Sequence, residues 1–292
     1  MEKPKYTFEE KRKSFENENY VLLTEKYIDS HQMLQYICAN GHKHHITWGN
    51  WNNGHRCPFC YKQPRKYEIN EYSFEKMSPE AAYWLGFIAA DGNIRTKKNH
   101  EGTIKGISFH LSKKDKNHLE KFKLFIKSNH PIYNDKNKPM IVFAVYSKQM
   151  YNDLVKWGIK ERKSWSLSSH IELIPDEYKS YFICGLVDGD GCFTISKRGN
   201  TTNKNVLIMS NIATLEDIRR YLEKYDIIDK KIHSTVSKNL FLLSIGKRNE
   251  ILSFFNLYES CPVHLDRKYE KVQIIKRALK NVKRGILDWY PI

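Results

Sequence analysis

The pattern of hydrophobic and polar residues goes through the same changes of period twice along this chain. Two apolar runs, Trp84–Gly92 and Ile183–Gly191, have the composition of buried helices. Each run is followed by segments in which every second residue is apolar, a pattern typical of half-buried strands. The clearest of these segments are Ile107–Leu111 and Phe241–Ile245. The sequence therefore predicts two similar halves, each built of helices and strands.

The same order of elements is expected after each apolar run. In the first half we predict strands to about Thr96 and at Ile104–Leu111, a helix at Lys116–Ile126, strands at Ile132–Tyr133 and Met140–Tyr146, and a helix at Lys148–Trp157. In the second half we predict strands at Phe193–Ser196 and Val206–Ser210, a helix at Leu215–Tyr225, strands at Lys231–Val236 and Leu240–Ile245, and a helix at Glu250–Tyr258. Each half then has the order αββαββα. The stretch Tyr269–Lys283 is apolar at helical spacing and is expected to pack on the second half.

Both apolar runs end in Asp-Gly, and the two aspartates, Asp91 and Asp190, are 99 residues apart. The following glycine fits a left-handed C-cap. The acid is unexpected, because the C-terminus of a helix carries partial negative charge. A bound cation would compensate the carboxylate, so the repeated feature indicates a duplicated metal site.

Small residues form a stripe on both predicted helices. Gly86 and Ala90 are four residues apart, and so are Gly185 and Gly189, which places each pair on one helix face. A face without side chains lets another backbone approach closely. We therefore expect the two helices to pack on each other, with the two motif aspartates side by side at the same end.

These segments resemble the motifs of the LAGLIDADG homing endonucleases, in the single-chain form that carries two motifs. The second segment matches the family pattern at Gly185, Asp188, Asp190 and Gly191. The first segment has Ala89 where the family often has its earlier acid, but Asp91 keeps the later one. The resemblance covers roughly residues 74–270. It implies an α+β fold in which two pseudo-symmetric αββαββα halves form a saddle of antiparallel sheets over the DNA major groove.

The resemblance also implies a function, the site-specific hydrolysis of both strands of duplex DNA with a divalent metal. Asp91 and Asp190 would bind Mg²⁺, together with the peptide carbonyls of Ala90 and Gly189. Polar residues at the strand ends would complete the catalytic set, namely Lys148, Lys247, Lys113 and Asn211. Because both motifs lie in one chain, we expect a monomer on a long asymmetric target.

Polar residues of the predicted hairpins are the candidates for DNA contacts, since long basic and amide side chains read base edges in the major groove. In the first half these are Arg95, Lys97, Lys98, Ser108 and His110. In the second half they are Ser196, Lys197, Arg198, Asn203, Lys204 and Ser210. Their orientation depends on a strand register that can slip by one residue.

Two other functions of the same fold stay open. LAGLIDADG folds also occur as RNA maturases that assist intron splicing, and as transcriptional regulators that no longer cleave. Regulators usually lose the motif acids, and both acids are present here, which favours an enzyme. A maturase can retain them, so intron RNA stays open as a partner.

The charge of the chain agrees with a nucleic-acid partner. Its 292 residues contain 49 Lys plus Arg against 33 Asp plus Glu, a net charge of +16, and a chain this basic is expected to bind a polyanion. No run of about 18 apolar residues exists, which excludes a membrane-spanning helix. The first residues, MEKPKYTFEE, are too polar for a signal peptide. We therefore expect an intracellular protein.

A second group of residues with metal-ligand spacing precedes the first motif. Cys38 and His42 are separated by three residues, and Cys57 and Cys60 by two. Two such pairs on tight turns can hold a structural zinc ion. The stretch resembles small treble-clef and zinc-ribbon modules, in which His42 fits the motif better than the nearby His44, His45 and His55.

This spacing completes the expected domain organisation. Residues 1–66 would form a zinc-binding accessory module that contacts DNA or only supports the fold. The two halves would follow at residues 74–165 and 174–292, the second of them including the C-terminal helix. Three other cysteines, Cys184, Cys192 and Cys261, are isolated in the sequence and are expected to be reduced thiols.

Overall fold

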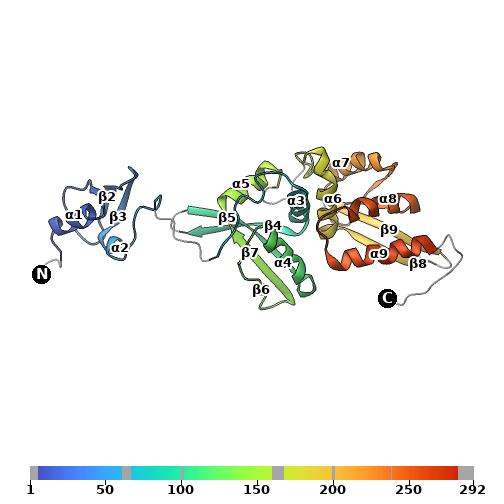
Figure 1. Cartoon of the computed structure of the whole chain (residues 1–292), viewed down its shortest axis with the longest axis horizontal. Coiled ribbons are helices and arrows are strands. Elements are labelled where there is room, and N and C mark those ends of the chain that lie inside the picture. Colours follow the sequence, from blue (N-terminus) through green and yellow to red (C-terminus); the bar gives the residue numbers. More distant parts are fainter. Residues whose placement is uncertain are drawn as a thin grey trace. The chain divides into compact units, whose positions relative to one another are not determined.

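The alternating segments of the sequence form three antiparallel sheets in the computed structural model (Figure 1). The structure describes residues 6–60, 67–99, 102–159, 168–198, 201–237 and 239–281. Side chains are described for all of these except residues 96–99, 102–104, 197–198, 201–202 and 281. The chain divides into two units, residues 1–66 and residues 67–292.

The N-terminal unit is a three-stranded sheet with two short helices. Its elements are α1 (Phe8–Glu16), β1 (Val21–Leu22), β2 (Met33–Ile37), β3 (Lys43–Thr47) and α2 (Trp48–Asn52), and the strand order is β1-β2-β3. Thr7 begins α1 with a capping box that includes Glu10. The core is aromatic: the rings of Phe15 and Trp51 stack with centroids 3.7 Å apart, and Tyr36 is fully buried beside them. The core consists of only a few residues, so a metal site could add substantially to its stability.

The first half of the second unit begins with the motif helix α3. Its elements are α3 (Pro79–Asp91), β4 (Gly92–Asn99), β5 (Gly102–Ser112), η1 (Lys113–Asp115), α4 (Lys116–Phe125), β6 (Tyr133–Asn134), β7 (Met140–Tyr146) and α5 (Lys148–Lys156). The sheet order is β4-β5-β7-β6, with every pair antiparallel. Ser78 caps α3 by accepting a hydrogen bond from the Ala81 amide at 3.1 Å.

The second half repeats this order and adds a long helix. Its elements are η3 (Asp176–Tyr178), α6 (Lys179–Asp190), β8 (Cys192–Arg198), β9 (Thr201–Ser210), α7 (Ile212–Leu222), η4 (Glu223–Tyr225), β10 (Ile232–Ser234), β11 (Phe241–Ile245), α8 (Arg248–Glu259) and α9 (Asp266–Asn281). Its sheet order, β8-β9-β11-β10, is that of the first half. The predicted α+β fold and the twofold αββαββα order are confirmed.

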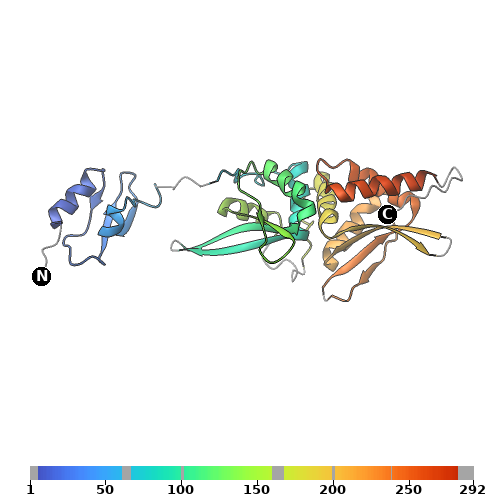
Figure 2. The same cartoon turned by 90° about the horizontal axis from the view of Figure 1, so that it is seen from below.

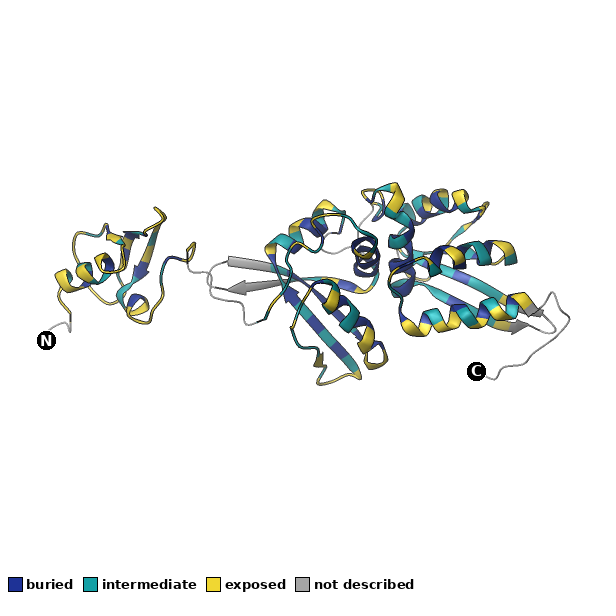
Figure 3. Cartoon of the chain, viewed as in Figure 1, coloured by how far each residue is buried: buried dark blue, intermediate teal, exposed yellow. Residues whose placement is uncertain are grey.

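Period-two alternation decides which face of each sheet is buried. Ile107 and Phe109 of β5 belong to the core on the side that the helices cover, whereas His110 lies on the opposite, open face. Figure 2 shows the sheets of both halves spread below the helices, and Figure 3 shows that burial is continuous through α3 and α6. One apolar core therefore runs across both halves. No helix in the described part of the chain is long and apolar enough to cross a bilayer.

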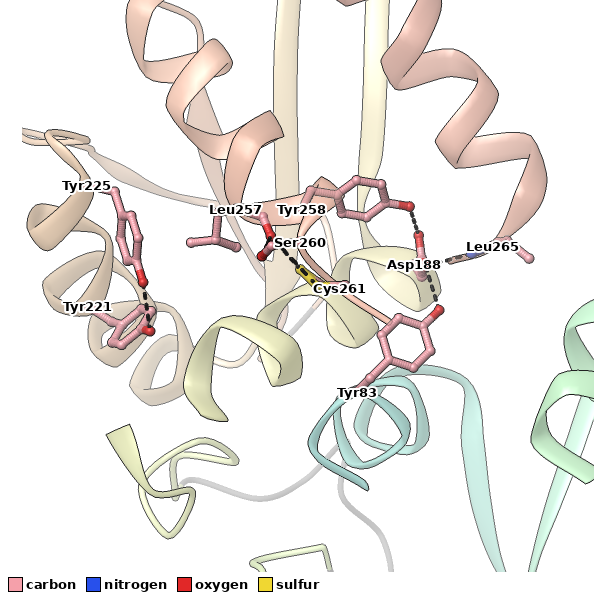
Figure 4. Close-up of a disulfide and its surroundings, with 10 residues drawn as sticks. Tyr83, Asp188, Tyr221, Tyr225, Leu257, Tyr258, Ser260, Cys261 and Leu265 are labelled. Carbon is pink, nitrogen blue, oxygen red and sulfur yellow. Dashed lines mark hydrogen bonds between the residues drawn. A yellow bond between two sulfur atoms is a disulfide. The ribbon is translucent and has the colours of Figure 1, made fainter. Parts of the chain in front are cut away.

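One expectation about the cysteines is wrong. Cys184 of α6 and Cys261, just after α8, are joined in a disulfide, although they are 77 residues apart in sequence. They are not the isolated thiols that the sequence indicated, because the turn after α8 brings Cys261 against the motif helix (Figure 4). Cys192 keeps a free, partly exposed thiol.

Candidate functional site

The two motif helices pack backbone to backbone. A Cβ on Gly86 would lie 1.9 Å from the Phe182 carbonyl oxygen and 2.8 Å from the Leu186 amide nitrogen. By the pseudo-symmetry of the halves, a Cβ on Gly185 would fall on the Tyr83 carbonyl in the same way. The close packing of α3 on α6 that the glycines predicted is confirmed. Only glycine permits this contact at these two positions.

The packing brings the C-terminal ends of both helices together. A Cβ on Gly189 would meet the side chain of Ala90 and lie 3.4 Å from the Asp91 amide nitrogen. Asp91 ends α3 and Asp190 ends α6, so the two acids leave the helix pair at the same end. This is the point where β4 and β8 begin, at the junction of the two sheets.

The sequence predicts that the glycines after the aspartates are left-handed caps, and this prediction is wrong. Gly92 has φ −72° and ψ 151°, and Gly191 has φ −93° and ψ 171°, so both are extended. Each helix passes directly into a strand and turns close to its own last turn. A Cβ on Gly92 would lie 2.7 Å from Ile88 Cγ2, and one on Gly191 would lie 2.6 Å from the Val187 carbonyl oxygen. Space, and not backbone handedness, is the reason for glycine here.

The third motif acid, Asp188, is a buried structural carboxylate. It accepts hydrogen bonds from the hydroxyls of Tyr83 and Tyr258, each at 2.5 Å, and from the Leu265 amide at 2.8 Å (Figure 4). Burial raises the pKa of Asp188 to about 6, against the lowering effect of these hydrogen bonds. Tyr83 also contacts the buried His118, whose pKa falls to about 3 through burial. Asp188 thus joins α6 to α3, α8 and the start of α9.

A buried lysine closes the C-terminal end of α6. The ammonium of Lys268, in the first turn of α9, donates to the carbonyl oxygens of Val187 (2.8 Å), Asp188 (2.6 Å), Gly189 (3.1 Å) and Gly191 (2.8 Å). A cation is favourable at this end of a helix. Burial lowers the pKa of Lys268, and the negative charges of Asp188 and Asp91 oppose that shift. Lys268 therefore places positive charge beside the motif aspartates.

Contacts between the halves hold the start of α9. Lys121 of α4 forms an ion pair with Asp266 and donates to the His264 carbonyl at 2.9 Å. Arg267 pairs with Asp115 at 2.9 Å. Lys268 follows these residues directly, so the first half helps to fix the position of its ammonium.

Lys148 and Lys247 follow the fourth strand of each half. Strand β7 runs outward from the motif, because Gly92 pairs through Phe109 with Phe143. Lys148 and Lys247 follow the outer ends of β7 and β11, roughly 10–17 Å along the strands from the motif ends. Both side chains are exposed. Lys148 and Lys247 lie where the sequence predicts them, at the junctions of β7 with α5 and of β11 with α8, and their catalytic role stays a prediction. Lys268 is the lysine that donates to the carbonyls of the second motif.

The other two strand-end candidates lie at the inner ends of β5 and β9. Lys113 is exposed and begins η1. Asn211 caps α7, since its Oδ1 accepts from the Thr214 amide at 2.8 Å and its Nδ2 donates to the Ser168 carbonyl at 3.1 Å. These contacts give Asn211 a structural task, and its catalytic role stays a prediction.

Strand register sorts the candidates for DNA contact. Arg95 and His110 lie on the open face of the first sheet, where Arg95 Nη2 and His110 Nε2 are 2.6 Å apart. Burial and the charge of Arg95 lower the pKa of His110. Ser196 and Asn203 pair on the open face of the second sheet, and both are exposed. The side chains of Lys97, Lys98, Lys197 and Arg198 lie outside the described residues.

Register corrects two of the candidates, Ser210 and Lys204, and burial corrects a third, Ser108. Ser210 is buried on the helix-covered face of β9, in the same alternation as Val206. Lys204 points to the same helix-covered face as Val206. It lines a cavity with Arg248 and Leu279 from the covering helices. Ser108 is on the open face but is fully buried. Ser210 and Lys204 face the helices and not the open side of the sheet, whereas Ser108 is excluded by its burial alone.

The four residues with zinc-ligand spacing converge in the N-terminal unit. His42 Nδ1 lies 3.4 Å from Cys38 Sγ, 3.2 Å from Cys60 Sγ and 3.8 Å from Cys57 Sγ. Within the described ranges, these four residues are the one group of three or more Cys, His, Asp or Glu whose ligand atoms all lie within 4.8 Å of one another. Tetrahedral zinc with Zn–S of about 2.3 Å requires ligand spacings of roughly 3.5–3.8 Å.

The electrostatics of this group also suit a metal. Burial raises the pKa of Cys38, but hydrogen bonds from the His42 amide and from Cys60 outweigh it and lower the pKa to about 6. A thiol with a lowered pKa is readily available as a thiolate ligand. The geometry selects His42 among the nearby histidines.

Solved structures of LAGLIDADG endonucleases have a similar fold. Meganuclease I-SmaMI bound to uncleaveable DNA with a TTGT central four is 16% identical, with a TM-score of 0.52 over 72% of this chain and 91% of that chain. Meganuclease I-AabMI bound to uncleaved DNA is 13% identical, with a TM-score of 0.52 over 71% and 92%. The I-LtrWI homing endonuclease bound to target DNA is 15% identical, with a TM-score of 0.52 over 71% and 92%.

The fold of the chain is therefore that of the LAGLIDADG endonucleases. The family model described as LAGLIDADG-like domain matches residues 177–257, which span the second motif and most of the second half. No curated protein matches the chain in sequence. The resemblance that the two motifs indicated is confirmed for the fold and for the second half.

Proposed function

We propose that this protein is a metal-dependent endonuclease that cuts both strands of a specific DNA duplex. The observation that carries the proposal is the pairing of two helix C-termini, each ending in an aspartate, at the junction of two antiparallel sheets. The net charge of +16 favours a polyanionic substrate. The structures of similar fold bound to DNA support a duplex as that substrate.

Asp91 and Asp190 are the proposed ligands of Mg²⁺. Carboxylate and carbonyl oxygens are the ligands that Mg²⁺ takes in proteins. The two acids fit this task, because each ends a helix where the local field disfavours a carboxylate. The Gly189 carbonyl keeps a second lone pair beside the one that accepts from Lys268, and Ala90 offers the equivalent carbonyl of α3. When bound, the metal supplies an activated water and stabilises charge on the phosphate.

Lys268 is the basic residue that we favour for the site over Lys148 and Lys247, because it contacts the second motif directly. Its ammonium holds the last carbonyls of α6 in place and keeps positive charge behind Asp190. That charge offsets the repulsion between two adjacent carboxylates. It also favours the approach of a phosphate to the same point. Asp188 has no role in the chemistry, because it is fully buried and its oxygens already accept three hydrogen bonds.

The open faces of the two sheets are the proposed DNA-reading surface. The first face carries Arg95 and His110, and the second carries Ser196 and Asn203. Because the two faces differ in their side chains, the preferred target is asymmetric, and one chain supplies both halves of the site. We propose that the N-terminal unit holds one structural zinc ion on Cys38, His42, Cys57 and Cys60.

The test is the substitution of each motif aspartate. A cleavable site is first selected from a random duplex library with Mg²⁺. Asp91→Asn and Asp190→Asn should each reduce double-strand cleavage at least ~100-fold, because each removes charge that the metal requires. Binding in Ca²⁺ and the melting temperature should stay near those of the wild type, since phosphate and base contacts lie elsewhere.

The matched control is Asp229→Asn, an exposed aspartate of the second half that lies outside both motifs. A motif variant that cuts both strands at a rate near that of the wild type would contradict the active-site assignment. A wild-type protein that binds intron RNA tightly and never cuts DNA would favour the maturase instead.

A further inference from the structure

Charge is segregated within the N-terminal unit. All seven acidic residues of residues 1–66 precede Ser30, and residues 30–66 contain none. That second stretch holds five Lys plus Arg and five His, and it includes all four zinc-ligand positions. Residues 1–29 balance their seven acids with six Lys plus Arg, and one of these acids, Glu18, forms an ion pair with Arg56. The segment that carries the metal-ligand residues is therefore basic, and the segment before it is close to neutral.

An exposed aromatic ring lies in this basic segment. Phe59, between Cys57 and Cys60, is 63% exposed. Its ring centroid is 5.4 Å from that of His42 and 5.9 Å from that of His44. Lys43 and His45 are exposed on the neighbouring strand β3. We call Lys43, His44, His45 and Phe59 the zinc-end patch.

A zinc ion bound by the four ligand residues would fix the backbone at this patch. Phe59 is held between two of the zinc-ligand cysteines, and Lys43 directly follows His42. The backbone that carries the ring and the neighbouring cation would then have little freedom to move. A phenyl ring that stays largely exposed gains nothing for the fold of its own unit, but it becomes favourable when a partner covers it. Phe is among the apolar side chains that DNA-binding proteins insert between base steps in the minor groove, beside basic residues.

We infer that the zinc-end patch binds duplex DNA next to the cleavage site, with Phe59 as the apolar contact and Lys43 as a phosphate contact. The absence of acids from residues 30–66 selects a polyanion over a protein partner. The imidazole rings are tilted by 39° and 59° against Phe59. The three rings of the patch are not parallel, so they could not stack on successive bases of a single strand. Phe59 alone could insert between two base steps of a duplex. The inference rests on the proposed nuclease function, which supplies the adjacent duplex.

The experiment uses the full chain with zinc, in Ca²⁺, on a long duplex that carries the selected target. Phe59→Ala should weaken duplex binding about tenfold, the size expected for one aromatic–base contact. Lys43→Gln should reduce the slope of log affinity against log salt by about one. Hydroxyl-radical footprinting of both variants should lose protection in a flanking segment and keep it over the cleavage site. Zinc content by elemental analysis should stay at one ion per chain.

The matched control is Ile28→Ala. Ile28 is 71% exposed in the same unit but lies next to Asp29 and outside the basic segment, so its removal should change neither the affinity nor the footprint. If Phe59→Ala binds the duplex like the wild type with an unchanged footprint, the inference is overturned while the nuclease proposal stands. Loss of affinity for an oligo(dT) single strand alone would also overturn it, in favour of a single-strand site. A wild-type protein that neither binds nor cuts the duplex would instead refute the nuclease proposal.

Discussion

The contact between α3 and α6 makes a strong prediction about two glycines. Gly86→Ala and Gly185→Ala should each destabilise the second unit, although alanine is the better helix former. A methyl group at Gly185 would overlap the Tyr83 carbonyl and lie 2.8 Å from the Phe87 nitrogen. The added Cβ would lie 1.9 Å from the Tyr83 carbonyl oxygen. Ordinary contacts of a Cβ begin at about 3.4 Å, so the helices would have to move apart by roughly 1.5 Å.

The magnitude follows from two opposing effects. Alanine gains about 1 kcal/mol over glycine in helix propensity. A radial gap of about 0.5–1 Å forfeits about a quarter to a half of the dispersion energy along the seam. The seam includes Phe87, Phe182 and Leu186, which are all buried. With the overlap added, we expect a net loss of about 2–4 kcal/mol for either variant.

Thermal melting of the second unit measures this loss. In a unit of this size, about 1 kcal/mol shifts the melting temperature by about 2–4 °C, so a decrease of roughly 5–15 °C is expected. Gly49→Ala is the matched control, because Gly49 lies in α2 with no atom within 4 Å of its added Cβ, and that variant should melt like the wild type. A Gly185→Ala protein that melts within about 2 °C of the wild type would refute the packing that we describe.

Three further predictions test the contacts around the site. Reversing one charge of the Lys121–Asp266 pair should cost about 0.5–1 kcal/mol in urea unfolding, and the double swap should recover it; a double variant no better than the singles would exclude a stabilising ion pair. Chelation of zinc or Cys57→Ser should abolish the near-ultraviolet circular dichroism of the N-terminal unit alone, and an unchanged spectrum would argue against a structural metal. Lys268→Met should slow cleavage about 100-fold with binding retained, whereas Lys247→Met should change it less than about threefold; equal effects would remove Lys268 from the site.

The repeated fold could be predicted because its signals are local. Alternation such as that of Ile107, Phe109 and Leu111 depends only on neighbouring residues and a buried sheet face. The contact between the motif helices was also predictable, since a glycine at the same position of two apolar helices leaves each backbone open to a close approach by the other. The element bounds differ only slightly, for example α9, which begins at Asp266 and not at Tyr269.

The catalytic surroundings could not be predicted in the same way. Lys268 meets the second motif from a position far along the chain, and only the three-dimensional path of α8 and α9 brings it there. One signal in the sequence did mark it: Lys268 shares a helix face with Val272, Ile275 and Leu279, which are all buried. A lysine on the apolar stripe of a helix requires buried acceptors. The error at Lys204 has a different cause: consecutive residues of a strand, such as Asn203 and Lys204, point to opposite faces, so only one of the two can lie on the open face.

The two motif acids of the second half have separate tasks, and this separation accounts for the difference between the motifs. Asp190 ends α6 at the junction with α3, whereas Asp188 is fully buried and accepts three hydrogen bonds from groups on α3, at the end of α8 and before α9. Ala89 occupies the equivalent place in α3 and is also buried. An alanine there removes a buried carboxylate without removing a proposed metal ligand. Loss of the earlier acid from the first motif therefore changes how that half is held together, and it leaves the pair of acids proposed for the chemistry complete.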